Sequence, residues 1–271
     1  MNRVTKPKTL SYLSYNFTFD KKSVKNNINQ MKKNDFYQPL QHGFRYVESN
    51  NRIQLAFDTL SKLDISSLLD CGCGDGSFLE KMRHEVPGIR LAGAEICLPA
   101  VIEARGKNLD VIQHDFDSGP MPFDPGSFDA CFLGEVIEHV FSPDDMLDDI
   151  KRILKPGGWL FITTPNLGSW FNRFSLLFGF QPVYTEVSTR ANAGHMINLP
   201  GQPAGHIRMF TLRALKELVK REGFMIEESF GIGLNPGMHS GHKWIYLVLN
   251  FIFSHPDLSS GLAILAKTPG K

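Results

Sequence analysis

The stretch from Leu68 to Glu80 contains the residue types most able to carry out chemistry. It reads LLDCGCGDGSFLE, in which two cysteines alternate with three glycines, with Asp70 before the first cysteine and Asp75 after the second. Cysteine thiolates bind zinc and take part in redox reactions. A glycine-rich turn between a strand and a helix instead brings backbone N–H groups against a ligand. The composition of this stretch therefore allows either a metal or redox loop, or a nucleotide-binding loop.

The spacing of the cysteines favours the nucleotide-binding loop. Cys71 and Cys73 form a C-x-C pair, and no second pair of cysteines or histidines has the spacing of a zinc site. We therefore expect no metal centre, and interpret both side chains as small apolar groups that pack beneath the loop. The other two cysteines, Cys97 and Cys131, do not complete the spacing of a secreted disulfide framework.

The glycines of the stretch distinguish between classes of nucleotide. Gly72, Gly74 and Gly76 form a G-x-G-x-G pattern, whereas dinucleotide-binding loops have the pattern G-x-G-x-x-G. Ser77 occupies the place of the third dinucleotide glycine. This difference argues against an NAD-dependent oxidoreductase, which stays as the alternative function.

Acidic residues follow at the ends of the next predicted strands. Glu95 ends one strand about twenty residues after the loop, where a carboxylate can accept hydrogen bonds from both hydroxyls of a ribose. Asp115 and Phe116 end another, where an acid can accept a hydrogen bond from an adenine amino group and an apolar ring can cover the base. The segment GEVIEHV, residues 134–140, ends the strand after that.

Alternating strands and helices must position these residues. The predicted strands cover residues 66–72, 89–96, 110–116, 128–136, 159–166, 224–232 and 261–269. The predicted helices cover residues 47–63, 78–85, 99–107, 142–154 and 211–224. This alternation predicts an α/β fold with a largely parallel sheet, whose strands end along a common ligand-binding edge. Residues 167–205 interrupt the alternation, are rich in glycine, proline, asparagine and aromatic residues, and are predicted to form a lid.

The charge and hydropathy of the chain limit its partners. The net charge is only +1, so no nucleic-acid partner is expected. Residues 1–47 are predicted to be a solvated basic arm, with contact to an anionic membrane or substrate as the alternative. The most apolar segment, Trp244–Phe253, has about half the ~20 residues of a membrane-spanning helix, so we expect a buried helix, with peripheral membrane contact as the alternative. No N-terminal run is typical of a signal peptide, and we expect a cytoplasmic protein.

Taken in order, these motifs resemble those of the class I S-adenosylmethionine (SAM) dependent methyltransferases. The resemblance is strong over residues 66–166 and greatest with the small-molecule branch whose fourth strand ends in E-V-x-E-H, as in ubiquinone-biosynthesis methyltransferases. It implies SAM as cofactor and a Rossmann-like seven-stranded sheet of order 3-2-1-4-5-7-6 with the last strand antiparallel. Residues 48–271 would form one SAM-binding domain, with residues 167–205 as its lid.

The resemblance also implies a role for each motif. The cofactor-binding residues that it implies are Asp70, Cys71, Gly72, Gly74 and Gly76 for the methionine portion, Glu95 for the ribose, Ile96, Asp115 and Phe116 for the adenine, and Leu133, Gly134 and Glu135 for the path to the sulfonium. A non-catalytic SAM-binding module would keep the same residues and is a second alternative.

The residues that remain predict the acceptor side. A hydroxyl acceptor needs a general base, for which His139, His195 and His206 are candidates, each with a structural role as the alternative. Trp170 in the lid, together with Phe174 and Arg208, is a candidate acceptor contact, although the aromatic residues could instead belong to the core. We therefore expect a small apolar or amphipathic acceptor, methylated on oxygen, carbon or nitrogen.

Overall fold

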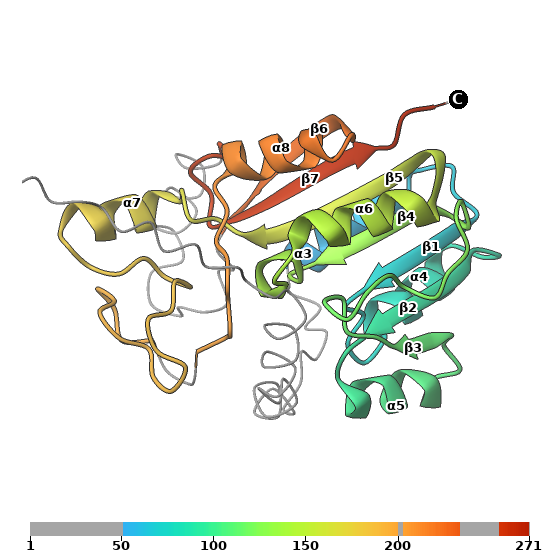
Figure 1. Cartoon of the computed structure of the whole chain (residues 1–271), viewed down its shortest axis with the longest axis horizontal. Helices are drawn as coiled ribbons and strands as arrows, with labels where there is room; N and C mark the ends of the chain where they lie inside the picture. The colour runs from blue at the N-terminus through green and yellow to red at the C-terminus, as the bar shows by residue number, and fades with distance from the viewer. Residues whose placement is uncertain (1–50, 200–202, 234–254, 271) are drawn as a thin grey trace, which may run out of the picture. The chain divides into compact units, whose positions relative to one another are not determined.

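The computed structural model describes residues 51–199, 203–233 and 255–270, which form a sheet flanked by helices (Figure 1). Its seven strands have the order β3-β2-β1-β4-β5-β7-β6. The strands are β1 Ser67–Cys71, β2 Arg90–Glu95, β3 Val111–Gln113, β4 Phe128–Gly134, β5 Leu154–Pro165, β6 Met225–Ile232 and β7 Gly261–Lys267. Strands β1 to β5 pair in parallel, whereas β7 is antiparallel to both β5 and β6. The predicted strand order and antiparallel last strand are confirmed.

Helices pack on both faces of this sheet. They are α3 Asn51–Leu60, α4 Ser77–Glu85, α5 Leu98–Gly106, α6 Pro143–Ile153 and α8 Leu212–Arg221. The 3-10 helix η2 Ile137–His139 follows β4, and α7 Trp170–Leu177 follows β5. Cys131 and Leu133 of β4 pack in one cluster with side chains of α6 and α8. Ala130 and Phe132 pack in another with side chains of α3 and α4. Successive residues of a strand face opposite sides, so β4 is buried on both faces from Ala130 to Leu133, where every residue is apolar.

The fifth strand begins earlier than the predicted start at Trp159. It starts at Leu154, so the KPGG sequence belongs to the strand instead of separating it from α6. The backbone N–H of Gly157 donates a hydrogen bond to the carbonyl of Pro269 at 3.0 Å, and that of Gly158 donates to the Thr268 hydroxyl at 3.0 Å. These hydrogen bonds to residues that follow β7 hold the two glycines in place in the first half of β5.

The third strand is shorter than predicted. It ends at Gln113, so Asp115 and Phe116 lie in the loop that follows it. The predicted lid is also more regular than its composition suggests, since it contains the helix α7. Ser169 caps α7 by accepting a hydrogen bond from the N–H of Asn172.

Two predicted segments fall outside the described residues. They are the basic arm, residues 1–47, and the apolar segment Trp244–Phe253. Within the described ranges, no helix is long and apolar enough to cross a membrane. The division into an arm, a SAM-binding domain and a lid stays a prediction.

Asp129 of β4 forms hydrogen bonds that connect β4 to β1 and β5 at the end of the sheet opposite the glycine loop. Its Oδ2 accepts hydrogen bonds from the Ser66 N–H at 3.1 Å and from the hydroxyls of Ser66 and Ser67, both at 2.7 Å. Its Oδ1 accepts a hydrogen bond from Lys155 Nζ at 2.6 Å. Burial alone would raise the pKa of Asp129, but the hydrogen bonds from Lys155 and the serines outweigh it and hold that pKa well below its usual value.

Replacing Asp129 with asparagine is expected to lower the free energy of unfolding by about 1–3 kcal/mol at pH 7, because hydrogen bonds to a charged group are lost. Since the folded pKa lies below the unfolded value of about 3.9, the carboxylate stabilises the fold above that pH, and this stabilisation is lost as the pH falls. Urea denaturation should therefore show a smaller difference between wild type and variant at pH 3 than at pH 7. Equal differences at both pH values would show that the charge of Asp129 does not stabilise the fold.

Candidate active site

The glycine loop joins β1 to α4 at the carboxyl edge of the parallel strands. Gly72, Gly74 and Gly76 have positive φ angles of 82°, 54° and 77°, a conformation that residues with a side chain rarely adopt. The N–H of Gly72 donates to the carbonyl of Ala94 at 2.7 Å, which holds the loop against the end of β2. A Cβ on Gly72 would lie 2.2 Å from Cγ2 of Val136, so the loop also lies against the turn that follows β4.

Glu95 is the last residue of β2 and connects the loop to the next helix. It is largely buried, at 9% exposure. Its Oε2 accepts a hydrogen bond from the N–H of Gly74 at 2.9 Å, and its Oε1 accepts one from the N–H of Cys97 at 2.8 Å. Each carboxylate oxygen has a second lone pair, so both can still accept hydrogen bonds from a ligand. The backbone therefore fixes the orientation of this carboxylate before any ligand binds.

Asp70 lies in β1 immediately before the loop and is buried. Burial raises the pKa of Asp70 well above its usual value, and the negative charge of Glu95 raises it further. Two carboxyl groups so placed favour a cationic group in a ligand, because a nearby positive charge offsets both the burial and the repulsion.

The residues predicted to bind adenine gather next to Glu95. The N–H of His114 donates to the carbonyl of Glu95 at 2.9 Å, which brings the end of β3 against the end of β2. The carbonyl of Ile96 accepts a hydrogen bond at 3.1 Å from Nε2 of Gln113, the last residue of β3. Oδ1 of Asp115 accepts a hydrogen bond at 3.1 Å from the N–H of Asp117, within the loop that follows β3. Phe116 is partly buried against the main core.

The cysteines of the loop point into the core. Cys71 is fully buried, with its Sγ 3.4 Å from that of Cys131, and Cys73 packs with Leu79 of α4. The hydrogen bond with Cys131, together with burial, raises the pKa of Cys71, and burial raises that of Cys73. Both thiols are therefore neutral. The Cys71 side chain does not reach the loop surface, although the resemblance places this residue at the cofactor.

Replacing Cys71 and Cys73 together with alanine is expected to change the affinity for S-adenosylhomocysteine (SAH) by less than tenfold, or ~1.4 kcal/mol. The free energy of unfolding should fall by about 1–3 kcal/mol, because the buried sulfur atoms leave small cavities. Isothermal titration measures the first quantity and urea denaturation the second. A larger loss of affinity in a folded variant would show that the thiols take part in binding.

The turn after β4 contains a residue in an unusual backbone conformation. Glu135 has a φ of 56° although it is not glycine, which is typical of residues held in place for function. Its carboxylate forms an ion pair with Arg52 of α3. Burial raises the pKa of Glu135, and the positive charge of Arg52 offsets part of that rise. Nothing in the sequence singles out Arg52, because α3 and this turn are far apart along the chain.

The two residues before Glu135 pack against the core. The Leu133 side chain is fully buried in the core. A Cβ on Gly134 would lie 2.5 Å from the ring of Phe132, so a side chain at this position would displace a core residue.

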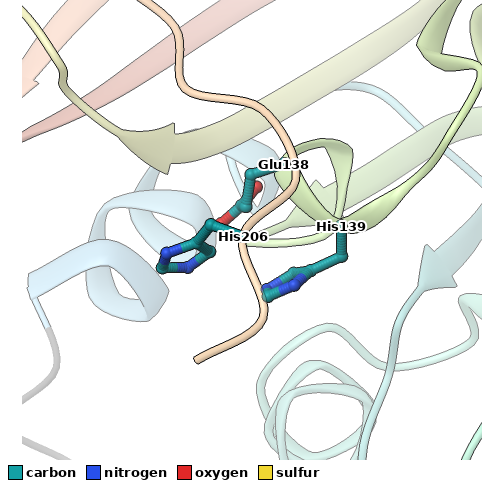
Figure 2. A group of neighbouring side chains, drawn as sticks. All are labelled: Glu138, His139 and His206. Atoms are coloured by element: carbon teal, nitrogen blue, oxygen red, sulfur yellow. The ribbon is translucent and has the colours of Figure 1, made fainter. Parts of the chain in front are cut away.

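Three polar side chains meet beside this turn (Figure 2). Glu138 and His139 belong to η2, whereas His206 comes from the segment that precedes α8. The ring centroids of the two imidazoles are 4.8 Å apart. Glu138 is fully buried, and its Oε2 accepts a hydrogen bond from the Thr164 hydroxyl at 3.0 Å. We call Glu138, His139 and His206 the polar triad.

Backbone hydrogen bonds bring the two parts of the polar triad together. The N–H groups of Ile207 and Arg208 donate to the carbonyl of Glu138 at 2.9 and 3.1 Å. Burial, aided by the neighbouring His206, lowers the pKa of His139 to about 4, and burial also lowers the pKa of His206. Burial raises the pKa of Glu138, and the charge of the neighbouring Glu135 raises it further.

The structure separates the third predicted base from the other two. His195 is held within the lid, where its Nδ1 lies 3.1 Å from the carbonyl of Gln181. Arg208 is partly engaged as well, since its Nη2 donates to the carbonyl of Phe141 at 2.6 Å. Glu138, which the sequence places in the E-V-I-E-H motif without a site role, joins the group instead.

Helix α7 of the lid presents apolar side chains at the surface. Phe174 is 47% exposed and Leu177 is 76% exposed, so neither belongs to the core. The ring of Phe174 contacts that of Phe178, with centroids 4.7 Å apart. Trp170 packs edge-on against Phe171 with centroids 5.7 Å apart. An apolar surface of this kind is typical of a site for an apolar ligand or partner.

Comparisons with known proteins agree with this geometry. A family model described as a methyltransferase domain matches residues 41–229. The ubiquinone biosynthesis O-methyltransferase of Chromobacterium violaceum is 26% identical over 209 residues, which are 71% of this chain and 79% of that protein.

Solved structures with the same fold include two SAM-dependent enzymes. A SAM-dependent methyltransferase from Thermotoga maritima has a TM-score of 0.56 at 16% identity, over 87% of this chain and 99% of that one. The phosphoethanolamine N-methyltransferase 2 of Haemonchus contortus, solved in complex with SAM, has a TM-score of 0.55 at 18% identity, over 87% of this chain and 59% of that one. At these identities the similarity is one of fold.

Proposed function

Because the chain belongs to the methyltransferase-domain family and is a SAM-dependent methyltransferase, we propose that it methylates an oxygen atom of a small apolar or amphipathic acceptor. The relative from Chromobacterium violaceum is named as an O-methyltransferase of ubiquinone biosynthesis, which supports oxygen as the acceptor atom. An NAD-dependent oxidoreductase finds no support among the related proteins.

The observation that carries this proposal is the polar triad, with its buried Glu138, beside a lid with an apolar surface. The triad follows β4, and the lid contains the exposed side chains of α7. A hydroxyl must lose its proton at or before methyl transfer, and Glu138, His139 and His206 form a polar surrounding for that oxygen. Carboxylate or amine acceptors need much less help of this kind. The apolar side chains, Trp170 and Phe174 among them, would contact the remainder of the acceptor.

We place SAM along the carboxyl edge of the strands. Asp70 and the loop at residues 72–76 hold its charged methionine portion, and Glu95 accepts from the ribose hydroxyls. The adenine lies against Ile96, Asp115 and Phe116. The sulfonium then faces residues 133–135, beside the polar triad. The sulfonium already makes the methyl group electrophilic, so the protein mainly aligns the acceptor oxygen with the S–CH3 bond and excludes water.

The cellular location of the reaction is proposed from the sequence alone. The chain would work in the cytoplasm on a small-molecule acceptor. Contact with a membrane surface, through the apolar lid or the basic arm, stays a prediction.

Transfer of an isotope-labelled methyl group from SAM tests the proposed function. The acceptor panel contains an alkyl-substituted catechol, an alkyl-substituted monophenol, a long-chain carboxylic acid and a long-chain amine. We expect label in a methoxy group of a phenolic acceptor. Label found only in the amine or the carboxylic acid would contradict oxygen methylation of a hydroxyl. The same assay on a variant with His206 replaced by alanine would show whether the polar triad takes part.

A further inference from the structure

One acidic side chain of the lid lies beside the polar triad without belonging to it. Glu186 comes from the middle of the lid, and only 10% of its side chain is exposed. Its Oε1 accepts a hydrogen bond from the N–H of Ala204 at 2.5 Å, and its Oε2 accepts one from the N–H of Gly205 at 2.8 Å. Hydrogen bonds from backbone N–H groups to a carboxylate are among the stronger ones in proteins. Glu186 therefore fixes the two residues that directly precede His206.

The same turn of the lid holds the side chain of His206. Nδ1 of His206 lies 3.1 Å from the carbonyl of Tyr184 and 3.7 Å from Oε1 of Glu186. Burial lowers the pKa of His206, so the neutral ring has a single hydrogen. A carbonyl oxygen can only accept, so this hydrogen is on Nδ1 and Nε2 has a free lone pair. The ring of Tyr184 packs edge-on against the imidazole, with centroids 5.6 Å apart.

Tyr184 has a backbone conformation that a large side chain rarely adopts. Its φ is 68°, in the left-handed region, where residues other than glycine are uncommon. Such conformations persist where the surrounding structure holds them, and they cluster at functional sites. Here the strained residue is the one whose carbonyl meets His206. This observation is independent of the hydrogen bonds of Glu186 and indicates that the turn serves the polar triad.

Contacts with η2 hold the other side of the segment that carries His206. The carbonyl of Gly205 lies 3.1 Å from Nδ1 of His139. The N–H of Ile207 donates to the carbonyl of Glu138 at 2.9 Å. The segment is therefore bound on one side by the turn after β4 and on the other by the lid, through Glu186.

The turn that contains Glu186 is also connected to α7. The N–H of Val183 donates to Oδ1 of Asn172 in α7 at 2.8 Å. Asn172 is buried, and its Nδ2 donates to the carbonyl of Asn166, directly after β5, at 3.0 Å. The helix with the exposed apolar side chains and the polar triad are thus joined through one turn of the lid.

We propose that Glu186 is a positioning residue, which holds residues 204–206 so that Nε2 of His206 faces the acceptor hydroxyl. This role rests on the proposed function, because it needs a hydroxyl acceptor beside the polar triad. Methyl transfer depends on alignment of the acceptor oxygen with the S–CH3 bond, and a small displacement of a positioning group lowers the rate steeply. Glu186 touches neither SAM nor the acceptor in this arrangement and acts through His206.

Nuclear magnetic resonance of isotope-labelled protein tests the positioning without SAM, acceptor or turnover. At neutral pH we expect the ring hydrogen of His206 on Nδ1, with the resonance assigned by its loss in His206→Ala. In Glu186→Ala this signature should disappear, because the ring is released from the carbonyl of Tyr184. The amide hydrogens of Ala204 and Gly205 should exchange with solvent at least about 10-fold faster.

Two further variants accompany this measurement. Glu186→Gln keeps the size of the side chain, but its amide nitrogen cannot accept, so one of the two amide hydrogens should exchange faster. Glu103→Gln, on the exposed surface of α5, should match the wild type. All variants should bind SAH within about threefold of wild type, which shows that the domain remains folded. A His206 hydrogen that stays on Nδ1 in Glu186→Ala, with unchanged amide exchange, would overturn the proposal.

A double-variant cycle tests whether Glu186 acts through His206. With a phenolic acceptor that the wild type methylates, Glu186→Ala should lower kcat/KM for that acceptor at least about 10-fold and leave KM for SAM unchanged. In a chain that already contains His206→Ala, it should lower kcat/KM by less than about threefold. Equal losses in both backgrounds would overturn the proposal. Release of the His206 ring in Glu186→Ala, without methyl transfer to oxygen by the wild type, would overturn only the proposed function.

Discussion

Replacing Gly72 with alanine is expected to weaken SAH binding by at least 100-fold, or ~2.7 kcal/mol. The φ of 82° at Gly72 disfavours any side chain. The new Cβ would also lie 2.2 Å from Cγ2 of Val136. Either the loop or the turn after β4 must then move, and the cofactor is proposed to contact both. Isothermal titration with SAH measures the loss.

Two further variants separate the causes of this effect. Gly106→Ala lies at the end of α5, where a Cβ meets no atom within 4 Å, and it should bind SAH like the wild type. The double variant Gly72→Ala with Val136→Ala removes the clash but keeps the backbone strain, and should recover part of the affinity. Affinity of the single Gly72 variant within threefold of wild type would contradict the role given to the loop.

Replacing Glu95 with alanine is expected to weaken SAH binding by at least 100-fold. The carboxylate accepts hydrogen bonds from the N–H groups of Gly74 and Cys97, and is proposed to accept two more from the ribose. Removing it therefore loses charged hydrogen bonds to the ligand, each worth about 1.5–3 kcal/mol, and releases the loop. Glu95→Gln should have a smaller effect, because one side-chain oxygen is retained.

The Glu95 effect is measured by the same titration, with Glu103→Ala on the exposed surface of α5 as the control. The control should match the wild type. If Glu95→Ala binds SAH normally while remaining folded, the ribose is not held at the end of β2, and the placement of SAM must change.

The sequence contains most of the information for the half of the site where we propose that the cofactor binds. Asp70, the three glycines and Glu95 lie within one strand–loop–helix–strand unit, where local patterning dictates the geometry. The short third strand is an exception. It is predicted to reach Phe116, but its pairing with β2 ends where Gln113 lies opposite Glu95, the last residue of β2.

The acceptor half depends on contacts that no local pattern reveals. His206 meets His139 because the segment after the lid forms backbone hydrogen bonds with η2, through Ile207 and Arg208. Arg52 meets Glu135 across the same edge of the sheet. The polar triad combines an adjacent pair with a histidine that is distant along the chain, a combination that local spacing does not reveal.

A crystal structure of the protein with SAH bound tests the placement of the cofactor most directly. We predict that the homocysteine portion lies on residues 70–76, with both ribose hydroxyls within hydrogen-bonding distance of Glu95. The sulfur should face the turn at residues 133–135, on the side where Glu138, His139 and His206 lie. SAH bound with its sulfur directed away from this turn, or with its ribose remote from Glu95, would contradict the proposed site.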